Sequence, residues 1–236
     1  MDRAELIVAL DVASVAEVER VVDLLGDVVT FYKIGLELFS AEGPGVVEKV
    51  KSRNKKVFLD LKLHDIPRTV ERAVKSGASL GVDLMTVHAV GGRAMLRAAK
   101  EAALAAGANA PKILAVTVLT SLDQGDLADI GVSRDVRAQV EALGTFAFAN
   151  GADGIVCSPH EVLNMRALLG PGALLVTPGV RPAGADVGDQ KRVTTPAQAV
   201  RDGSSHLVIG RPILESPDPR AAALAIAREM HFSEQA

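Results

Sequence analysis

Short apolar runs alternate along the chain with longer stretches in which apolar and polar residues are mixed at helical spacing. The apolar runs are rich in valine, leucine and isoleucine, and several are followed by a polar residue or a glycine. A continuous apolar run of this kind predicts a strand that is buried on both faces. Eight such strands are expected, at about residues 6–10, 28–34, 56–61, 83–88, 112–118, 154–157, 173–177 and 205–209.

Helix start signals follow most of these strands. Ser14 with Glu17, and Ser158 with Glu161, have the spacing of a capping box, in which two side chains satisfy free backbone N–H groups. Proline stands in the first turn of several other expected helices, where it is tolerated. Helices are expected at about residues 14–25, 44–52, 67–80, 93–106, 134–150, 195–202 and 216–230, with a further one opening at Ser158.

The strand–helix repeat predicts the fold. Because crossovers between parallel strands are almost always right-handed, the strands should form one parallel sheet. Eight strand–helix units close into an α/β fold of the (β/α)8 TIM barrel type, with the active site at the C-terminal ends of the strands. No linker, low-complexity tract or change of composition divides the chain, so residues 1–236 are expected to form a single domain.

Composition agrees with helices packed on buried strands, and it narrows the possible partners. Hydrophobic residues make up 48% of the chain but aromatic residues only 3%, which disfavours a sandwich rich in aromatic pairs. The formal net charge of −3 and the lack of a long basic tract argue against nucleic-acid binding. Neither a signal peptide nor a run of transmembrane length is found, so we expect a cytoplasmic protein without membrane contact.

Cysteine and histidine offer little for metal or redox chemistry. The single cysteine, Cys157, excludes an intramolecular disulfide and fits a reducing compartment. Its apolar neighbours favour a small buried side chain over a nucleophile. No two histidines stand near a carboxylate at metal-ligand spacing, so no metal site is expected. His88 is interpreted as a packed or hydrogen-bonded barrel residue rather than a base, and His64 has no assigned role.

The clearest candidate for chemistry follows the third strand. Asp60, Lys62 and Asp65 come directly after a strand that looks wholly buried. Side chains alternate along a strand, so Asp60 and Lys62 should leave the same face. Buried charges are costly unless paired, which leaves two interpretations: an ion pair with Asp65 capping the next helix, or a working site. Polar residues near other strand ends favour the site, namely Asp11, Lys33, His88, Thr120, Ser158 and Arg211.

Several segments of the chain match one known family. The Asp-x-Lys-x-x-Asp core at 60–65 occurs together with the loop Thr177-Pro-Gly-Val-Arg-Pro182 and the ending Ile209-Gly-Arg-Pro212. Further matching segments lie at 8–11, 33–35, 66–69, 87–89, 115–121 and 188–192. With these motifs the sequence resembles the bacterial type 1 subfamily of the orotidine 5′-phosphate (OMP) decarboxylase family. One departure is Arg68, where many members have asparagine.

The resemblance implies an enzyme that converts OMP to UMP and CO2 in de novo pyrimidine biosynthesis, without a cofactor. Loss of CO2 leaves a carbanion at C6 with no adjacent carbonyl to delocalise it, so a fixed cation is the remaining source of stabilisation. By the family match Lys62 is that cation, and it then protonates C6. Asp60 would lie near the substrate carboxylate and either destabilise it or hold Lys62 in place. Lys33 would pair with Asp60 and reach the ribose hydroxyls.

The same match assigns the remaining site residues. Asp65 and Thr69 would enter the neighbouring subunit's site, which requires a homodimer. Loops after the seventh and eighth strands of such barrels form phosphate sites, and the glycines of the 178–192 loop fit a lid that closes over ligand. Expected contacts are Asp11 with the ribose, Thr120, Ser121 and Pro178 with the pyrimidine, and Arg181, Gln190, Gly210 and Arg211 with the phosphate end.

Two other functions stay open at this point. A magnesium-dependent decarboxylase of keto-sugar phosphates would keep Asp60, Lys62 and Asp65 but has no use for the Thr-Pro-Gly-x-Arg-Pro loop. A catalytically inactive barrel that only binds UMP-like nucleotides would not need the intact lysine and both aspartates.

Overall fold

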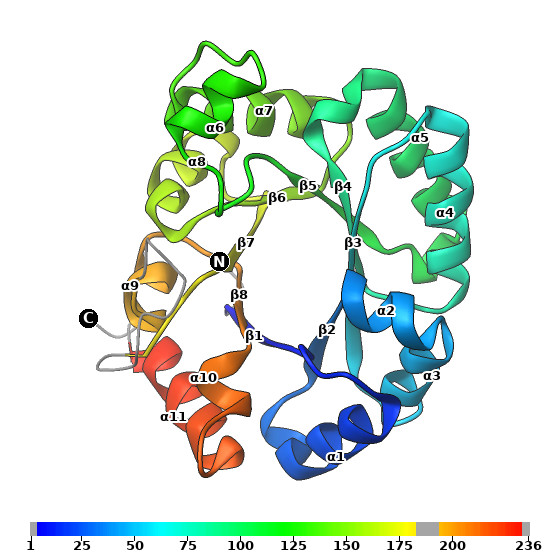
Figure 1. Ribbon diagram of the computed structural model, residues 1–236, viewed down its shortest axis with the longest axis vertical. Coiled ribbons are helices and arrows are strands. Elements are labelled where there is room, and N and C mark those ends of the chain that lie inside the picture. The colour runs from blue at the N-terminus through cyan, green and yellow to red at the C-terminus, as the bar shows by residue number, and fades with distance from the viewer. Residues whose placement is uncertain (1–3, 183–193, 233–236) are drawn as a thin grey trace.

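The computed structural model describes residues 4–182 and 194–232. Within them, eight parallel strands pair in sequence order and the eighth pairs with the first, so the sheet closes into a barrel. Helices surround the strands on the outside (Figure 1). The predicted TIM barrel is therefore confirmed. The strands are β1 (Glu5–Ala9), β2 (Phe31–Gly35), β3 (Lys56–Leu63), β4 (Leu84–His88), β5 (Lys112–Val116), β6 (Gly154–Val156), β7 (Leu174–Pro178) and β8 (His206–Ile209).

The helices follow the strands around the ring in chain order (Figure 1). The α-helices are α1 (Val15–Leu25), α2 (Leu36–Glu42), α3 (Gly45–Lys51), α4 (Pro67–Ser79), α5 (Gly92–Leu104), α6 (Gln124–Asp129), α7 (Val136–Ala149), α8 (Val162–Leu169), α9 (Pro196–Arg201), α10 (Arg211–Leu214) and α11 (Pro219–Phe232). Short 3-10 turns are η1 (Gly26–Val28), η2 (Ala89–Gly91), η3 (Gly107–Asn109) and η4 (Pro159–Glu161).

The helix caps follow the sequence signals. The Ser14 hydroxyl accepts a hydrogen bond from the Glu17 backbone N–H at 3.3 Å and so caps α1. Ser158 and Glu161 form the predicted reciprocal capping box at η4. Thr195 caps α9 with Pro196 in its first turn. These contacts satisfy backbone donors that a helix start leaves unpaired.

Several boundaries differ from the sequence prediction. Helices α2, α6 and α10 were not predicted, because each is shorter than the window of about 11 residues over which helical periodicity can be recognised. The second strand begins at Phe31 rather than at residue 28, since Val28 is the last residue of η1. The last helix starts at Pro219, after the predicted position. Most important for the site, β3 continues to Leu63 and carries Lys62 within it.

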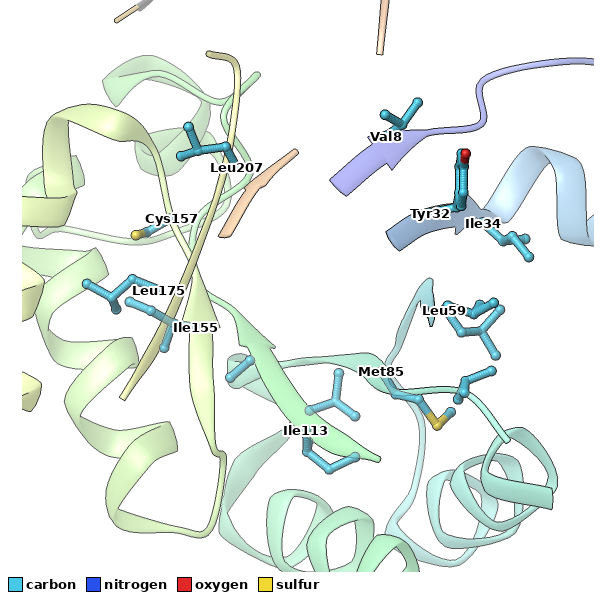
Figure 2. Packing of buried hydrophobic residues seen from close by; sticks show 14 of the residues in the cluster. Val8, Tyr32, Ile34, Leu59, Met85, Ile113, Ile155, Cys157, Leu175 and Leu207 are labelled. Carbon is cyan, nitrogen blue, oxygen red and sulfur yellow. The ribbon is translucent and has the colours of Figure 1, made fainter. Parts of the chain in front are cut away.

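Alternation along the strands divides the core into two layers. One cluster fills the barrel interior and consists of Ile7, Ala9, Phe31, Phe58, Leu84, Leu114, Val176 and Val208. The second cluster packs between the strands and the helices, and Figure 2 shows part of it, including Val8, Tyr32, Leu59, Met85, Ile113, Ile155, Cys157, Leu175 and Leu207. Because side chains alternate along a strand, the residue two positions after an interior residue also points into the barrel, closer to its mouth.

Cys157 belongs to the outer layer and is 1% exposed, as expected for a small buried side chain. Burial raises the pKa of its thiol far above the ordinary range, so the thiolate needed for nucleophilic chemistry is disfavoured. No helix in the described part of the chain is long and apolar enough to cross a membrane.

Candidate active site

Polar residues of the site lie on the same face of their strands as the hydrophobic residues of the barrel interior. Two residues after an interior hydrophobic residue, the next interior position holds a polar side chain or a glycine on five strands. These pairs are Ala9 with Asp11, Phe31 with Lys33, Phe58 with Asp60, Leu84 with Thr86, and Val208 with Gly210. The barrel therefore brings residues from distant parts of the sequence to one mouth.

Two ammonium groups converge on one carboxylate there. The Lys62 Nζ lies 2.8 Å from Asp60 Oδ2, and the Lys33 Nζ lies 3.8 Å from the same oxygen. Lys33 also lies 3.4 Å from Asp11 Oδ1. The side chain of Asp60 is 11% exposed and that of Lys62 is 37% exposed, so the lysine is the more accessible partner. The expected pairings of Asp60 with Lys62 and with Lys33 are both present.

The backbone at Lys62 departs from a regular strand. Its φ is 50°, in the left-handed region that non-glycine residues seldom occupy. The register between β3 and β4 shifts between Leu59 and Leu63, which marks a bulge around Lys62. Such a conformation costs on the order of 1–3 kcal/mol and tends to cluster at functional sites. Lys62 still reaches Asp60, but through this bulge rather than through the simple alternation that the sequence suggested.

A residue that the sequence prediction missed connects the two. Thr86, on β4, is 1% exposed; its Oγ1 donates to Asp60 Oδ1 at 2.9 Å and accepts the Lys62 backbone N–H at 2.9 Å. The signal that could have identified it is its position two residues after the interior residue Leu84. A lone threonine in an apolar run gave no other hint of a role.

The structure separates Asp65 from these charges. Its Oδ1 accepts the Ile66 backbone N–H at 2.7 Å, at the start of α4, and its side chain is exposed. Across the described residues, Asp65 forms no ion pair. Within one subunit the charged cluster therefore consists of Asp11, Lys33, Asp60 and Lys62, and Asp65 stands apart from it. Thr69, in the first turn of α4, is also exposed.

A small cavity of about 110 Å³ opens beside the charged cluster. Of the predicted site residues, Asp11, Lys33, Asp60 and Lys62 line it, together with residues such as Gly35, Leu36 and Leu38 that the sequence prediction had not assigned to the site. A Cβ at position 35 would lie 3.0 Å from the Lys33 Nζ, so glycine leaves room for this ammonium group. The charged residues lining the cavity are Asp11, Lys33, Glu37, Asp60 and Lys62.

Gly210 brings the end of β8 against the end of β1. A Cβ at this position would lie 3.0 Å from Asp11 Oδ2 and 3.3 Å from the Ala9 Cβ, which is tighter than ordinary contact. Arg211 follows as the exposed first residue of α10. Gly210, which is expected to contact phosphate, is thus next to Asp11, which is expected to contact ribose.

The other predicted contact residues lie on connections after β5 and β7. Thr120 and Ser121 are exposed beyond the end of β5. Pro178 is the last residue of β7, and the Arg181 backbone N–H donates to Thr194 O at 3.0 Å. Gln190 lies outside the described residues, as does the 183–193 part of the predicted lid. Because all strands are parallel, these connections share one end of the barrel with Asp60.

His88 lies near the cluster but is suited to remain neutral. Its ring centroid is 5.6 Å from that of His64. Burial lowers its pKa, and His64 and Lys62 lower it further, while Asp60 acts in the opposite direction. This agrees with the interpretation of His88 as a packed barrel residue. In the described part of the chain, no group of three or more His, Cys, Asp or Glu residues could hold a metal ion.

The fold and the site define a β/α-barrel protein with a lysine–carboxylate cluster at the C-terminal ends of its strands. The sequence model of the orotidine 5′-phosphate decarboxylase / HUMPS family matches residues 4–226. The chain therefore belongs to this family.

Similar proteins cover nearly the full chain. Orotidine 5′-phosphate decarboxylase of Rhodopseudomonas palustris (strain BisB5) is 54% identical over 229 residues, which are 97% of this chain and 95% of the relative. That of Moorella thermoacetica is 52% identical over 233 residues, 97% of this chain and 92% of the relative. The crystal structure of orotidine 5′-phosphate decarboxylase from Lactobacillus acidophilus superposes with a TM-score of 0.88 at 41% identity, covering 98% of this chain and 100% of that one.

Proposed function

We propose that this protein decarboxylates OMP to UMP and CO2 in pyrimidine biosynthesis. The observation that carries the proposal is the Lys62–Asp60 pair at the barrel mouth, in a chain more than half identical to OMP decarboxylases along nearly its full length. The reaction needs stabilisation of a carbanion, and a fixed ammonium group supplies it without a cofactor. In this proposal residues 1–236 act as one domain, and on the basis of its motifs we assign the chain to the bacterial type 1 subfamily.

Lys62 is the proposed catalytic residue. Its ammonium group is held by Asp60 yet is the more exposed of the two, so it can face a substrate at the barrel mouth. As CO2 leaves, the electron pair of the broken C–C bond remains on C6, and the adjacent positive charge lowers the energy of that carbanion. Lys62 then transfers a proton to C6, which gives UMP.

Asp60 has two possible contributions in this mechanism. Its carboxylate could stand close to that of the substrate, so that repulsion is relieved when CO2 leaves. It could also act by fixing Lys62, to which it is paired at 2.8 Å. Lys33 and Asp11, which are 3.4 Å apart, are the proposed ribose contacts. Lys33 thereby links ribose binding to the catalytic carboxylate.

The phosphate and the base are assigned to the loops around the mouth. Arg211 can grip a phosphate with two N–H donors, and Gly210 allows the backbone to approach it. Arg181 and Gln190 complete the proposed phosphate end, and Thr120, Ser121 and Pro178 the proposed contacts with the pyrimidine. Binding the remote phosphate would supply energy that orders the site.

A homodimer is the proposed assembly, with Asp65 and Thr69 entering the partner's site. Support comes from the surface of residues 64–69, all of which are exposed. Ile66 in this segment is 67% exposed, and Val90 nearby along the mouth is 52% exposed. These exposed apolar side chains lie close to Asp65, which forms no ion pair among the described residues. Such a surface is typical of one that another subunit covers. The proposed location is the cytoplasm, where the lone buried thiol of Cys157 suits a reducing environment.

An ultraviolet assay of OMP loss tests the proposal. Purified protein should consume OMP and produce UMP at equal rates, and EDTA should leave the rate unchanged. EDTA-sensitive decarboxylation of a keto-sugar phosphate with no OMP turnover would instead support the magnesium-dependent alternative. Tight UMP binding without turnover would support an inactive nucleotide-binding barrel.

A further inference from the structure

We propose that Thr86 is a positioning residue for Lys62 and Asp60, an inference that rests on the proposed function. The Thr86 hydroxyl donates its proton to Asp60 Oδ1 and accepts the backbone N–H of Lys62, each at 2.9 Å. One hydroxyl thus holds the side chain of the acid and the backbone of the lysine. Thr86 does not line the cavity beside the cluster, so it acts through these two residues rather than on a substrate.

The bulge in β3 explains why Lys62 needs this partner. Cα partners of β3 and β4 run from Phe58 with Leu84 to Leu59 with Met85, and the pairing resumes only at Leu63 with Val87. Between them, the Lys62 N–H points to the Thr86 side chain instead of a neighbouring carbonyl. A buried N–H without any partner would be destabilising. Thr86 therefore supports the left-handed backbone conformation that directs the Lys62 side chain toward the mouth.

The same hydroxyl orients the carboxylate of Asp60. With Oδ1 occupied by Thr86, the other oxygen, Oδ2, is the one that faces the ammonium groups of Lys62 and Lys33. Asp60 is 8% exposed and Thr86 is 1% exposed, which leaves little room for water to replace a missing hydroxyl. Loss of the hydroxyl should let the carboxylate rotate and release its ammonium partners.

Two substitutions at position 86 test this role, because one removes the hydroxyl group and the other keeps it. Thr86→Val keeps the shape but removes the hydroxyl, and kcat for OMP should fall by about 10- to 100-fold, the loss expected of a hydrogen bond to a charged group. The KM for OMP should change by less than about threefold, because Thr86 makes no proposed substrate contact. Thr86→Ser restores the hydroxyl and should return kcat to within about threefold of the unsubstituted enzyme.

Thr117→Val is the matched control. Thr117 is also buried, directly after β5, but its hydroxyl donates to the Val156 carbonyl at 3.2 Å and not to the cluster. This variant should keep its kcat. Unchanged kcat in Thr86→Val, or a Thr86→Ser enzyme as slow as Thr86→Val, would overturn the proposed role. If Thr86→Val does not fold, Thr86→Ala provides the same comparison with a smaller side chain.

A crystal structure of Thr86→Val separates this inference from the proposed function. The inference requires that Lys62 leaves the left-handed region or that its contact with Asp60 Oδ2 is lost. Unaltered geometry at both places would overturn it, whatever the activity. Absence of OMP turnover in the unsubstituted protein would contradict the proposed function, and the crystal structure would still decide the role of Thr86.

Discussion

Lys62 reaches Asp60 Oδ2 at 2.8 Å from a residue whose own φ is 50°. A regular strand would give these two side chains the same face without any unusual backbone. Here the chain bulges instead and interrupts the pairing of β3 with β4, which resumes only at Leu63. The bulge turns an ordinary strand-end ion pair into a fixed, partly exposed ammonium group.

Substitution of Gly210 should affect substrate binding more than chemistry. In Gly210→Ala the new Cβ would lie 3.0 Å from Asp11 Oδ2 and 3.3 Å from the Ala9 Cβ, so the Asp11 carboxylate, a proposed ribose contact, must move by a few tenths of an ångström. We expect the KM for OMP to rise by about tenfold, with a smaller change in kcat. Steady-state kinetics give both values.

Gly45→Ala is a suitable control for this experiment. Gly45 begins α3, and a Cβ there would meet no atom within 4 Å. Alanine should leave the kinetics unchanged and stabilise the helix by up to about 1 kcal/mol. Equal kinetic effects of the two substitutions would show that the contact between Gly210 and Asp11 is not important for binding.

Mixed dimers test the assignment of Asp65 to the partner's site. Lys62→Ala and Asp65→Ala homodimers should each be inactive or nearly so. After subunit exchange, a heterodimer would have one site with both Lys62 and Asp65 intact and another that lacks both, so activity should partly return. Exchange can be verified with differently tagged subunits. Exchange without any recovery of activity would argue that Asp65 serves its own subunit.

His206 should make the stability of the fold depend on pH. It lies on β8 with its ring edge-on to Phe31, 5.9 Å between centroids, and its Nδ1 is buried without a hydrogen-bond partner among the described residues. Burial lowers its pKa from 6.5 to about 4, with Glu5 opposing the shift and Lys56 adding to it. The unfolded chain therefore binds this proton more readily than the folded one, so stability falls as the pH drops from 6.5 toward 4.

The expected size is about 3 kcal/mol across that range, since one pKa unit corresponds to about 1.4 kcal/mol. Denaturant unfolding between pH 7 and pH 4 should show a flatter pH dependence for His206→Gln than for the unsubstituted protein. His160→Gln, which changes an exposed histidine, should not flatten it. A His206→Gln profile that parallels the original would rule out His206 as the source.

Sequence periodicity was sufficient for the barrel and for the central pair of the site. The apolar runs predict buried parallel strands, and the two-residue spacing of Asp60 and Lys62 predicts that they meet. The spacing of Thr86 from Leu84 could have placed its side chain on the interior face, but neither its two hydrogen bonds nor the bulge could be predicted, because they depend on how β3 pairs with a strand more than twenty residues away. The role of Asp65 could not be derived from its position along the chain, because its carboxylate is exposed and its proposed role is in the site of another subunit.

The most direct test of the central claim is the kcat of Lys62→Ala for OMP, measured beside Lys56→Ala. Lys56 stands at the other end of the same strand, where it pairs with Glu5 at 2.8 Å, and its removal should leave turnover unchanged. Removal of Lys62 takes away both the fixed charge and the proton donor, so kcat should fall by at least about 10⁴-fold while UMP binding largely survives. A Lys62→Ala enzyme with near-normal kcat would contradict the account.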